Sequence, residues 1–151
     1  MKRFLTVIFL FITVSTVKAN TGNISNLFIQ YLQQVHKIEN PPNDQTYIII
    51  DLLGCPPCVV WYSQEVENIF NDKKRKSFPS LIVVGNSEKP PDWLNSISKN
   101  HKNVYYDSKR FYHRINVTPN NSGIVTVKDG KIIERKIIKM ENYKKLFESI
   151  E

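Results

Sequence analysis

The two cysteines of the chain, Cys55 and Cys58, are separated by two prolines and follow a nearly uninterrupted apolar segment, Tyr47–Leu53. Such a segment predicts a strand that is buried on both faces, as in the middle of a parallel sheet. Prolines fit the first turn of an α-helix, where a missing N–H group costs nothing. We therefore expect a central strand, a tight turn and a helix that starts at the cysteines, inside an α/β domain.

Their position at a helix start is expected to make the cysteines reactive. A thiol at a helix start faces unpaired N–H groups and the positive end of the helix dipole, which favour the thiolate and lower the pKa of the thiol. Cys55 is therefore the predicted nucleophile. Residues three apart in a first helical turn share one face, so Cys58 can close a short disulfide with Cys55. The spacing favours a redox-active dithiol.

A pair of cysteines at this spacing also occurs in zinc sites, in haem attachment sites and in structural disulfides. Zinc sites usually need a second pair of ligands, and the chain has no other cysteine. A c-type haem site needs a histidine after the second cysteine, where this chain has Val59. A structural disulfide and ligation of a soft metal, chiefly Cu(I), remain open. We predict no bound metal and no cofactor.

The N-terminus has the three parts of a signal peptide. Lys2 and Arg3 precede the apolar stretch Phe4–Val14, and Val17-Lys18-Ala19 places small residues where a signal peptidase reads them. The stretch is shorter than the roughly 20 residues of a membrane-spanning helix, although an uncleaved anchor is the alternative. We expect residues 1–19 to be removed near Ala19 and the protein to be exported, to the periplasm or another extracytoplasmic space.

Export sets the redox conditions and the charge. An oxidising compartment keeps a cysteine pair as a disulfide unless a donor reduces it. The mature chain has 132 residues, enough for one domain, and its formal net charge falls from +7 to +4 because three cations leave with the signal peptide. The basic run Lys73–Lys76 is expected at a helix C-terminus, where it complements the dipole. We predict no nucleic-acid partner.

The remaining pattern alternates helices and strands. Apolar residues at helical spacing predict an amphipathic helix from Ile24 to Ile38, within an N-terminal helical extension over residues 20–46. The domain proper, residues 47–151, is expected to be α/β with a central mixed sheet, a parallel core and a C-terminal antiparallel hairpin, flanked by helices. Its expected elements are a helix from the cysteines to about 76, strands over 81–85 and 104–106, helices over 91–98 and 108–114 with Asp107 as N-cap, a hairpin over 123–128 and 131–138 around Asp129-Gly130, and a helix over 140–150.

Two further residues near the cysteines are candidates for a role. Asp51 places a carboxylate in an apolar strand, which is costly. It could shuttle a proton during thiol exchange, or it could be an acid at the strand end that is bonded to backbone or water. Trp61 lies off the apolar stripe of its helix and could dock a partner polypeptide, or be a rim residue without a role. The three histidines, His36, His101 and His113, are predicted to be surface or loop residues.

Three of these features in this order resemble the thioredoxin superfamily, and within it the exported TlpA/ResA-like thiol-disulfide oxidoreductases. They are the strand that ends in Cys55-Pro56-Pro57-Cys58, Asp107 with a helix leading to Val117-Thr118-Pro119, and the hairpin around Asp129-Gly130. The resemblance covers about Tyr47 to Glu151. It implies a thioredoxin-like fold.

The resemblance also implies residue roles. Cys55 would be the attacking thiol and Cys58 the buried resolving thiol. Pro119 would be a cis proline that faces the dithiol, and the backbone of Thr118 would pair with an extended substrate strand. Apart from the resemblance, the expected exposure of its ring adds Trp61 to the predicted substrate-binding residues.

The expected function is that of an exported enzyme, a thiol-disulfide oxidoreductase that exchanges its Cys55–Cys58 pair with cysteine-containing partner proteins. The resemblance favours reduction of those partners, which requires a thiol-disulfide electron donor in the membrane. We expect a monomer. The alternatives are a thioredoxin-fold binding or chaperone module whose disulfide is only structural, and a Cu(I)-handling protein.

Overall fold

The structure is a computed structural model that describes residues 22–119 and 121–150. The predicted signal peptide lies outside the described residues. Residues 22–36 form an N-terminal helix, which agrees with the predicted helix to within two residues. The elements that follow are β1 (Gln45–Asp51), α2 (Pro56–Asn71), β2 (Ser80–Val84), α3 (Asp92–Ser98), β3 (Val104–Asp107), α4 (Phe111–Ile115), β4 (Gly123–Lys128), β5 (Lys131–Ile137) and α5 (Tyr143–Glu148).

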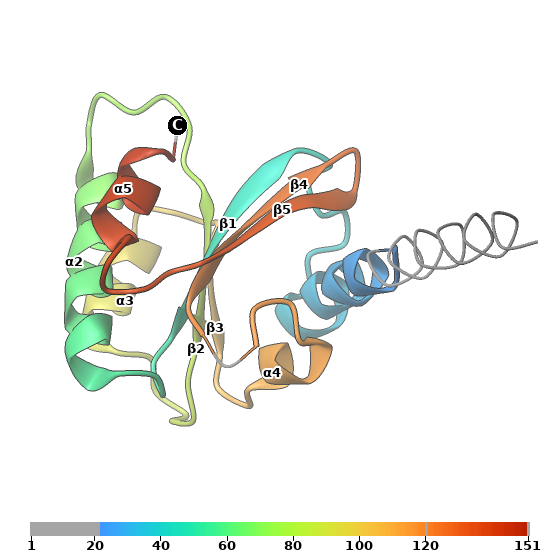
Figure 1. Ribbon diagram of the computed structural model, residues 1–151, viewed down its shortest axis with the longest axis horizontal. Helices are drawn as coiled ribbons and strands as arrows, with labels where there is room; N and C mark the ends of the chain where they lie inside the picture. Colours follow the sequence, from blue (N-terminus) through green and yellow to red (C-terminus); the bar gives the residue numbers. More distant parts are fainter. Residues whose placement is uncertain (1–21, 120, 151) are drawn as a thin grey trace, which may run out of the picture.

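The five strands form one mixed sheet in the order β3-β2-β1-β4-β5 (Figure 1). Strands β1, β2 and β3 are parallel, whereas β4 runs antiparallel to β1 and forms a hairpin with β5. The predicted parallel core with an antiparallel hairpin is confirmed. Because β4 starts where β1 ends, the segment before β4 lies beside the turn that leads into α2.

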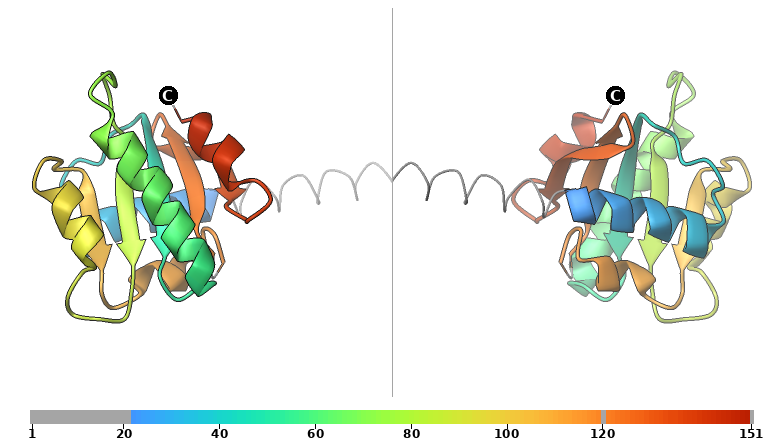
Figure 2. Two further views of the ribbon diagram at one scale, coloured as in Figure 1. Left: turned by 90° about the vertical axis from the view of Figure 1, so that its left-hand side faces the viewer. Right: turned by 90° about the vertical axis from the view of Figure 1, so that its right-hand side faces the viewer.

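Helices cover both faces of the sheet. Helices α2, α3 and α5 lie on one face, and the N-terminal helix and α4 lie on the other (Figure 2). Strand β1 is buried from both sides, since Ile48 and Ile50 belong to the first core and Tyr47 and Ile49 to the second. This burial is why the strand reads as a continuous apolar run in the sequence.

The N-terminal helix is packed into the second core. Phe28 and Leu32 are fully buried, and the Phe28 ring meets the Tyr47 ring edge to face, with 5.2 Å between the centroids. Tyr31 also packs on Tyr112 of α4. The extension is therefore part of the domain's core and not an appendage to it.

The hairpin turn has the backbone that the sequence predicted. Asp129 and Gly130 both have positive φ, 49° and 68°. Two consecutive residues of this kind form the turn that matches the twist of an antiparallel pair, and Asp-Gly is a preferred sequence for it.

Three helices have ends that differ from the prediction. Helix α2 ends at Asn71, so the basic run Lys73–Lys76 follows the helix and does not form its last turn. The final helix is shorter than predicted at both ends. Asp107 is not an N-cap, because it is the last residue of β3 and α4 begins only at Phe111, after Arg110 with φ 58°. The Asp107 carboxylate nevertheless accepts the backbone N–H of Tyr112, which holds α4 to the strand end.

Candidate active site

The dithiol lies at the C-terminal end of β1, where the chain turns into α2. Gly54 N–H donates to the carbonyl of Asp51 and closes the turn, and Cys55 is the N-cap residue of the helix. Cys55 and Cys58 form a disulfide with a Cα–Cα distance of 5.2 Å. Pro56 and Pro57 occupy the first two helical positions, as predicted.

The two cysteines differ in exposure. Cys55 is exposed at the helix start, whereas Cys58 is only 7% exposed and packs in the first core. An incoming thiol or disulfide therefore reaches the sulfur of Cys55 first. The arrangement gives one accessible sulfur and one protected sulfur in a single helical turn.

A pocket of about 180 Å³ opens beside the disulfide. Tyr62 of α2 forms part of its wall, and burial raises the pKa of this tyrosine, with a smaller contribution from Tyr143. The phenol is therefore a neutral group near physiological pH. The lining residues are Asp51, Gly54, Cys55, Cys58, Val59, Tyr62, Asn121, Ser122, Ile138, Lys139 and Met140.

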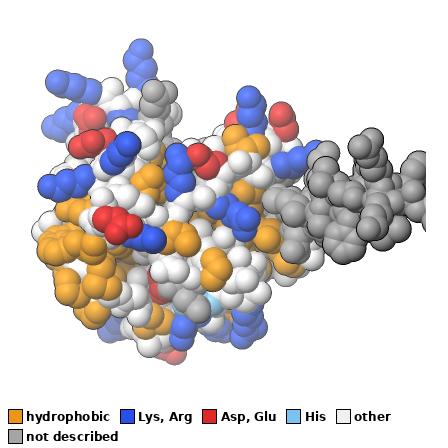
Figure 3. Space-filling model, in the orientation of Figure 1, with side chains coloured by type: hydrophobic (Ala, Val, Ile, Leu, Met, Phe, Trp, Pro, Cys, Tyr) orange, Lys and Arg blue, Asp and Glu red, His pale blue; other side chains and the backbone are white. Residues whose placement is uncertain are grey.

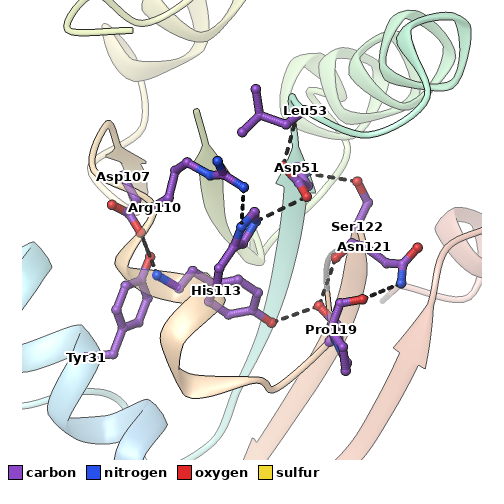
Figure 4. Close-up of polar contacts among 11 residues, drawn as sticks. Tyr31, Asp51, Leu53, Asp107, Arg110, His113, Pro119, Asn121 and Ser122 are labelled. Atoms are coloured by element: carbon purple, nitrogen blue, oxygen red, sulfur yellow. Dashed lines mark hydrogen bonds and ion pairs between the residues drawn. The ribbon is translucent and has the colours of Figure 1, made fainter. Parts of the chain in front are cut away.

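Asp51 is a buried carboxylate in this wall, only 3% exposed (Figure 4). Its Oδ1 accepts the backbone N–H of Leu53 at 3.1 Å, and its Oδ2 lies 3.1 Å from Nε2 of His113. Its backbone N–H donates to the hydroxyl of Ser122 at 2.9 Å. The carboxylate is thus bonded to backbone and to His113 on the α4 side of the sheet, and Asp51 is also one of the residues that line the dithiol pocket.

His113 is the site residue that the sequence did not indicate. It belongs to α4, as expected, but its side chain is only 14% exposed and is turned toward Asp51. Arg110 donates from its guanidinium to Nδ1 of His113 at 2.9 Å. A guanidinium can only donate, so Nδ1 of His113 is the acceptor of this bond and Nε2 is the ring nitrogen that faces Asp51.

The Thr118–Pro119 segment differs from what the resemblance implied. The peptide bond is trans, since none of the bonds between described residues is cis. Pro119 is exposed and does not line the dithiol pocket, and Asn121 and Ser122 occupy that wall instead. The physical reason is that the Thr118 hydroxyl donates to the carbonyl of Asn121, and the Asn121 N–H donates to the carbonyl of Thr118, which folds the segment into a turn.

Thr118 is buried and not displayed to a substrate. Its hydroxyl also lies 3.0 Å from the Tyr112 hydroxyl, and burial raises the pKa of that tyrosine. A Cβ on Gly123 would come within 2.6 Å of the Thr118 methyl group. The absence of a side chain at Gly123 is therefore what lets Thr118 pack against the start of β4.

Trp61 is 40% exposed, as expected, and its ring stacks on Tyr143 of α5 with 6.4 Å between the centroids. Leu53, Val60 and Met140 are also exposed apolar residues of this region. We call these four residues, Leu53, Val60, Trp61 and Met140, the apolar patch. Figure 3 shows hydrophobic side chains gathered over the N-terminal half of α2. Met140 lines the dithiol pocket, so the patch reaches Cys55.

A second network of hydrogen bonds lies on the same face of the sheet as His113, between the N-terminal helix and the end of β3. The Tyr31 hydroxyl donates to Asp107 at 3.2 Å and lies 2.8 Å from Nε2 of His36. Burial, with the charge of Asp107, raises the pKa of Tyr31. Burial lowers the pKa of His36 to about 4, against an opposing effect of Asp107. His36 is therefore a neutral, partly buried anchor of the N-terminal helix.

Neither a metal cluster nor a membrane span is visible in residues 22–119 and 121–150. These residues contain no group of three or more histidine, cysteine and acidic side chains that could hold a metal ion. Their helices also lack the length and apolarity of a membrane-spanning segment.

Comparison of the chain with protein-family models, with curated proteins and with solved structures finds no match. The chemistry of the site has to be inferred from its own residues.

Two features of the site were beyond the reach of sequence patterns. His113 and Ser122 meet Asp51 only because α4 and the start of β4 fold against the end of β1. The one local signal is the pair Arg110 and His113, spaced three apart like neighbours on a helix. That spacing suggests a contact between the two side chains but does not indicate the carboxylate.

Proposed function

We propose that the protein is a thioredoxin-like, exported thiol-disulfide oxidoreductase that exchanges the Cys55–Cys58 pair with cysteines of partner proteins. The observation that carries the proposal is the unequal exposure of the two sulfurs in a disulfide at a helix start. A structural disulfide gains nothing from an exposed sulfur, whereas exchange needs one.

The proposed reaction has two steps. In the reducing direction, the Cys55 thiolate attacks a partner disulfide, forms a mixed disulfide and releases one partner thiolate. The Cys58 thiol then loses its proton and attacks Cys55, which closes the intramolecular disulfide and releases the second partner thiolate. The free N–H groups and dipole of α2 favour the thiolate at Cys55, because this residue is the N-cap.

Asp51 is the proposed acceptor of the Cys58 proton. Both residues line one pocket whose volume allows water between them. A carboxylate in this position acts as a general base in the second step. The pocket thus supports the shuttle role for Asp51 that the sequence left open.

The partner is proposed to be a polypeptide that contains a cysteine pair. The apolar patch beside Cys55 suits the apolar side chains that flank cysteines in an unfolded or extended segment. Trp61 provides the largest ring of the patch, and the proposal gives it the docking role. The reducing direction, the membrane electron donor and the monomeric state are part of the proposal and rest on the family resemblance.

The test is to trap the mixed disulfide. In a Cys58→Ser variant, the Cys55 thiol should form a stable mixed disulfide with a disulfide-containing polypeptide such as insulin, seen as a covalent adduct by mass spectrometry. The matched Cys55→Ser variant retains only the buried thiol and should form at least tenfold less adduct. Equal labelling of both variants, or adduct in neither, would reject the assignment of Cys55 as nucleophile.

A further inference from the structure

One edge of the molecule is rich in lysine. Strands β1, β2 and β3 are parallel, so the loops that lead into β2 and β3 lie at the edge of the sheet opposite to the dithiol, which follows the end of β1. The β4–β5 turn lies at the same edge, because β4 runs antiparallel to β1 and its Val127 pairs with Gln45. We call this surface the basic edge, and it consists of Asp44 and residues 72–79, 99–103 and 128–131.

The loops of the basic edge are neighbours in space. The side-chain amide of Asn103 donates to the carbonyl of Phe78 at 3.3 Å, and the ring of His101 packs on the ring of Phe78. The Asp44 carboxylate accepts the N–H of Asp129 in the hairpin turn at 2.9 Å. A cavity of about 420 Å³ has both the loop before β2 and the hairpin in its wall. The charges of these loops therefore act together on one surface.

The basic edge carries more cations than anions. None of its lysines forms an ion pair with another residue of 22–119 or 121–150. Two of its acids are used in its own turns, since the carboxylates of Asp44 and Asp72 accept backbone N–H groups. Seven exposed lysines lie there beside three acids, although the whole mature chain has a formal net charge of only +4. The lysines are Lys73, Lys74, Lys76, Lys99, Lys102, Lys128 and Lys131.

Complementing a helix dipole does not account for these lysines. The last turns of α2 and α3 contain no basic residue, and the effect of a dipole falls off within the last turn. The one arginine of the edge, Arg75, is half-buried and donates to the carbonyl of Ile150 at 2.6 Å. The cations that face solvent are therefore all lysines.

Lysine indicates the kind of partner. Its ammonium is a compact charge on a flexible stem, without the planar fork by which arginine binds one carboxylate or phosphate in a fixed geometry. Unpaired lysines on adjacent loops suit a surface with many negative charges at no fixed positions. A lipid layer with anionic headgroups is such a surface, and it attracts clusters of four to eight basic residues.

We propose that the basic edge binds an anionic lipid surface and that the dithiol then faces away from the membrane. This inference goes beyond the proposed function and does not depend on the chemistry of the cysteines. Helix α2 has 16 residues and separates the two edges by about 24 Å, roughly three Debye lengths at physiological salt. Figure 3 shows Lys and Arg side chains over the upper end of the molecule, where α2 ends, and hydrophobic side chains over the lower part of α2.

The test is cosedimentation of the oxidised mature chain with vesicles. Vesicles of phosphatidylcholine that contain phosphatidylglycerol should bind the protein, whereas pure phosphatidylcholine should not. About 1 M NaCl should release it, because the Debye length then falls to about 3 Å. Glycerol phosphate at the same phosphate concentration should not compete, since the attraction needs many charges on one surface.

The double variant Lys73→Glu, Lys74→Glu should bind the anionic vesicles at least about tenfold more weakly, given the contribution of each lysine near such a surface. The matched control is Lys89→Glu, Lys109→Glu. These two lysines are also exposed and give the same change of net charge, but they follow β2 and β3 at the dithiol edge. The control should keep most of the affinity.

Trp61 reports the orientation of the bound protein. It belongs to the apolar patch near the dithiol and is 40% exposed. In a Trp93→Phe variant it is the only tryptophan of the chain. Acrylamide should quench its fluorescence equally with and without anionic vesicles, because the basic edge, and not the apolar patch, meets the lipid.

Three results would overturn the inference: no binding to anionic vesicles, an equal loss of binding in the two double variants, or protection of Trp61 by the vesicles. The second would make net charge the cause, and the third would assign binding to the apolar patch. Tighter binding of polyglutamate than of vesicles at equal charge would also overturn it, in favour of an acidic polypeptide. None of these outcomes bears on exchange at Cys55, so the proposed function is tested separately.

Discussion

Asp51 is a buried carboxylate, so its burial costs free energy, and it is also the residue to which we assign a proton transfer. Burying a carboxylate in an apolar strand is unfavourable unless donors compensate for the lost water. Here the compensation comes from Leu53 and His113, which are supplied by the turn after β1 and by α4. The sequence indicated the carboxylate and the dithiol because both are local features. It could not indicate His113, since that contact forms only in the folded chain.

Asp51→Asn keeps the shape and the acceptor oxygen of the side chain but removes the base. We expect the release of thiolate by Cys58 to slow roughly a hundredfold near neutral pH, in the usual range for loss of a general base. Attack by Cys55 should keep its rate, because the helix start is unchanged. The check is rapid mixing of the reduced protein with one equivalent of the aromatic disulfide DTNB, in which attack by Cys55 releases the first coloured thiolate and attack by Cys58 releases the second. Equal rates in wild type and variant would exclude Asp51 as the proton acceptor.

Among the elements, the segment from Thr118 to Gly123 departs most from the family pattern. The resemblance implied a cis proline at the dithiol, whereas the structure has a trans bond and a turn closed by Thr118 and Asn121. Such turns depend on hydrogen bonds between residues three apart, and two consecutive asparagines suit many of them. The strands and the hairpin were predicted well because burial and Asp-Gly leave local patterns. The turn leaves no such pattern, because asparagines fit many kinds of turn and do not specify this one.

Gly123→Ala tests how tightly this segment is packed. The new Cβ would lie 2.6 Å from the Thr118 methyl group and 2.9 Å from the carbonyl oxygen of Lys136. Since the backbone oxygen of a paired strand has little freedom to move aside, we expect a loss of about 1–3 kcal/mol in the free energy of unfolding. Gly54→Ala is the control, because its Cβ would meet only the Asp51 carbonyl at an ordinary 3.4 Å.

Denaturant unfolding of the two glycine variants measures the difference. Gly54→Ala should stay within about 0.5 kcal/mol of the wild type. A Gly123→Ala protein as stable as the Gly54→Ala protein would show that the segment has more room than the structure gives it.

At the scale of the whole molecule, the N-terminal helix completes the second core, whereas Cys58 packs in the first core on the other face of the sheet. Its helical period was readable from Ile24 to Ile38, but the sequence did not reveal that His36 would be partly buried against Tyr31 and Tyr105. A residue just off an apolar stripe is exposed or covered according to what packs beside the helix. Here Tyr105 of β3 covers it.

His36 makes stability depend on pH. In the unfolded chain it accepts a proton below about pH 6.5, whereas in the folded chain it does so only near pH 4. Between these values the unfolded state binds more protons, so the free energy of unfolding falls as the pH falls, by on the order of 3 kcal/mol in all. In His36→Gln this part of the loss should vanish.

The comparison of His36→Gln with the wild type by denaturant unfolding at pH 7 and pH 4.5 isolates the effect from that of the carboxylates. His101→Gln, at the far end of the sheet, serves as the reference substitution. Parallel pH profiles for His36→Gln and the wild type would contradict the burial of His36.

The measurement that tests the central claim most directly is the equilibrium reduction potential of the Cys55–Cys58 pair, taken in defined thiol buffers and scored by alkylation. We predict that the folded protein equilibrates readily and that the potential lies near or below that of thioredoxin, about −270 mV, as a reductase requires. A potential near about −120 mV would reverse the direction of exchange. A disulfide that exchanges with the buffer only after the protein is unfolded would contradict the claim and leave a structural bond.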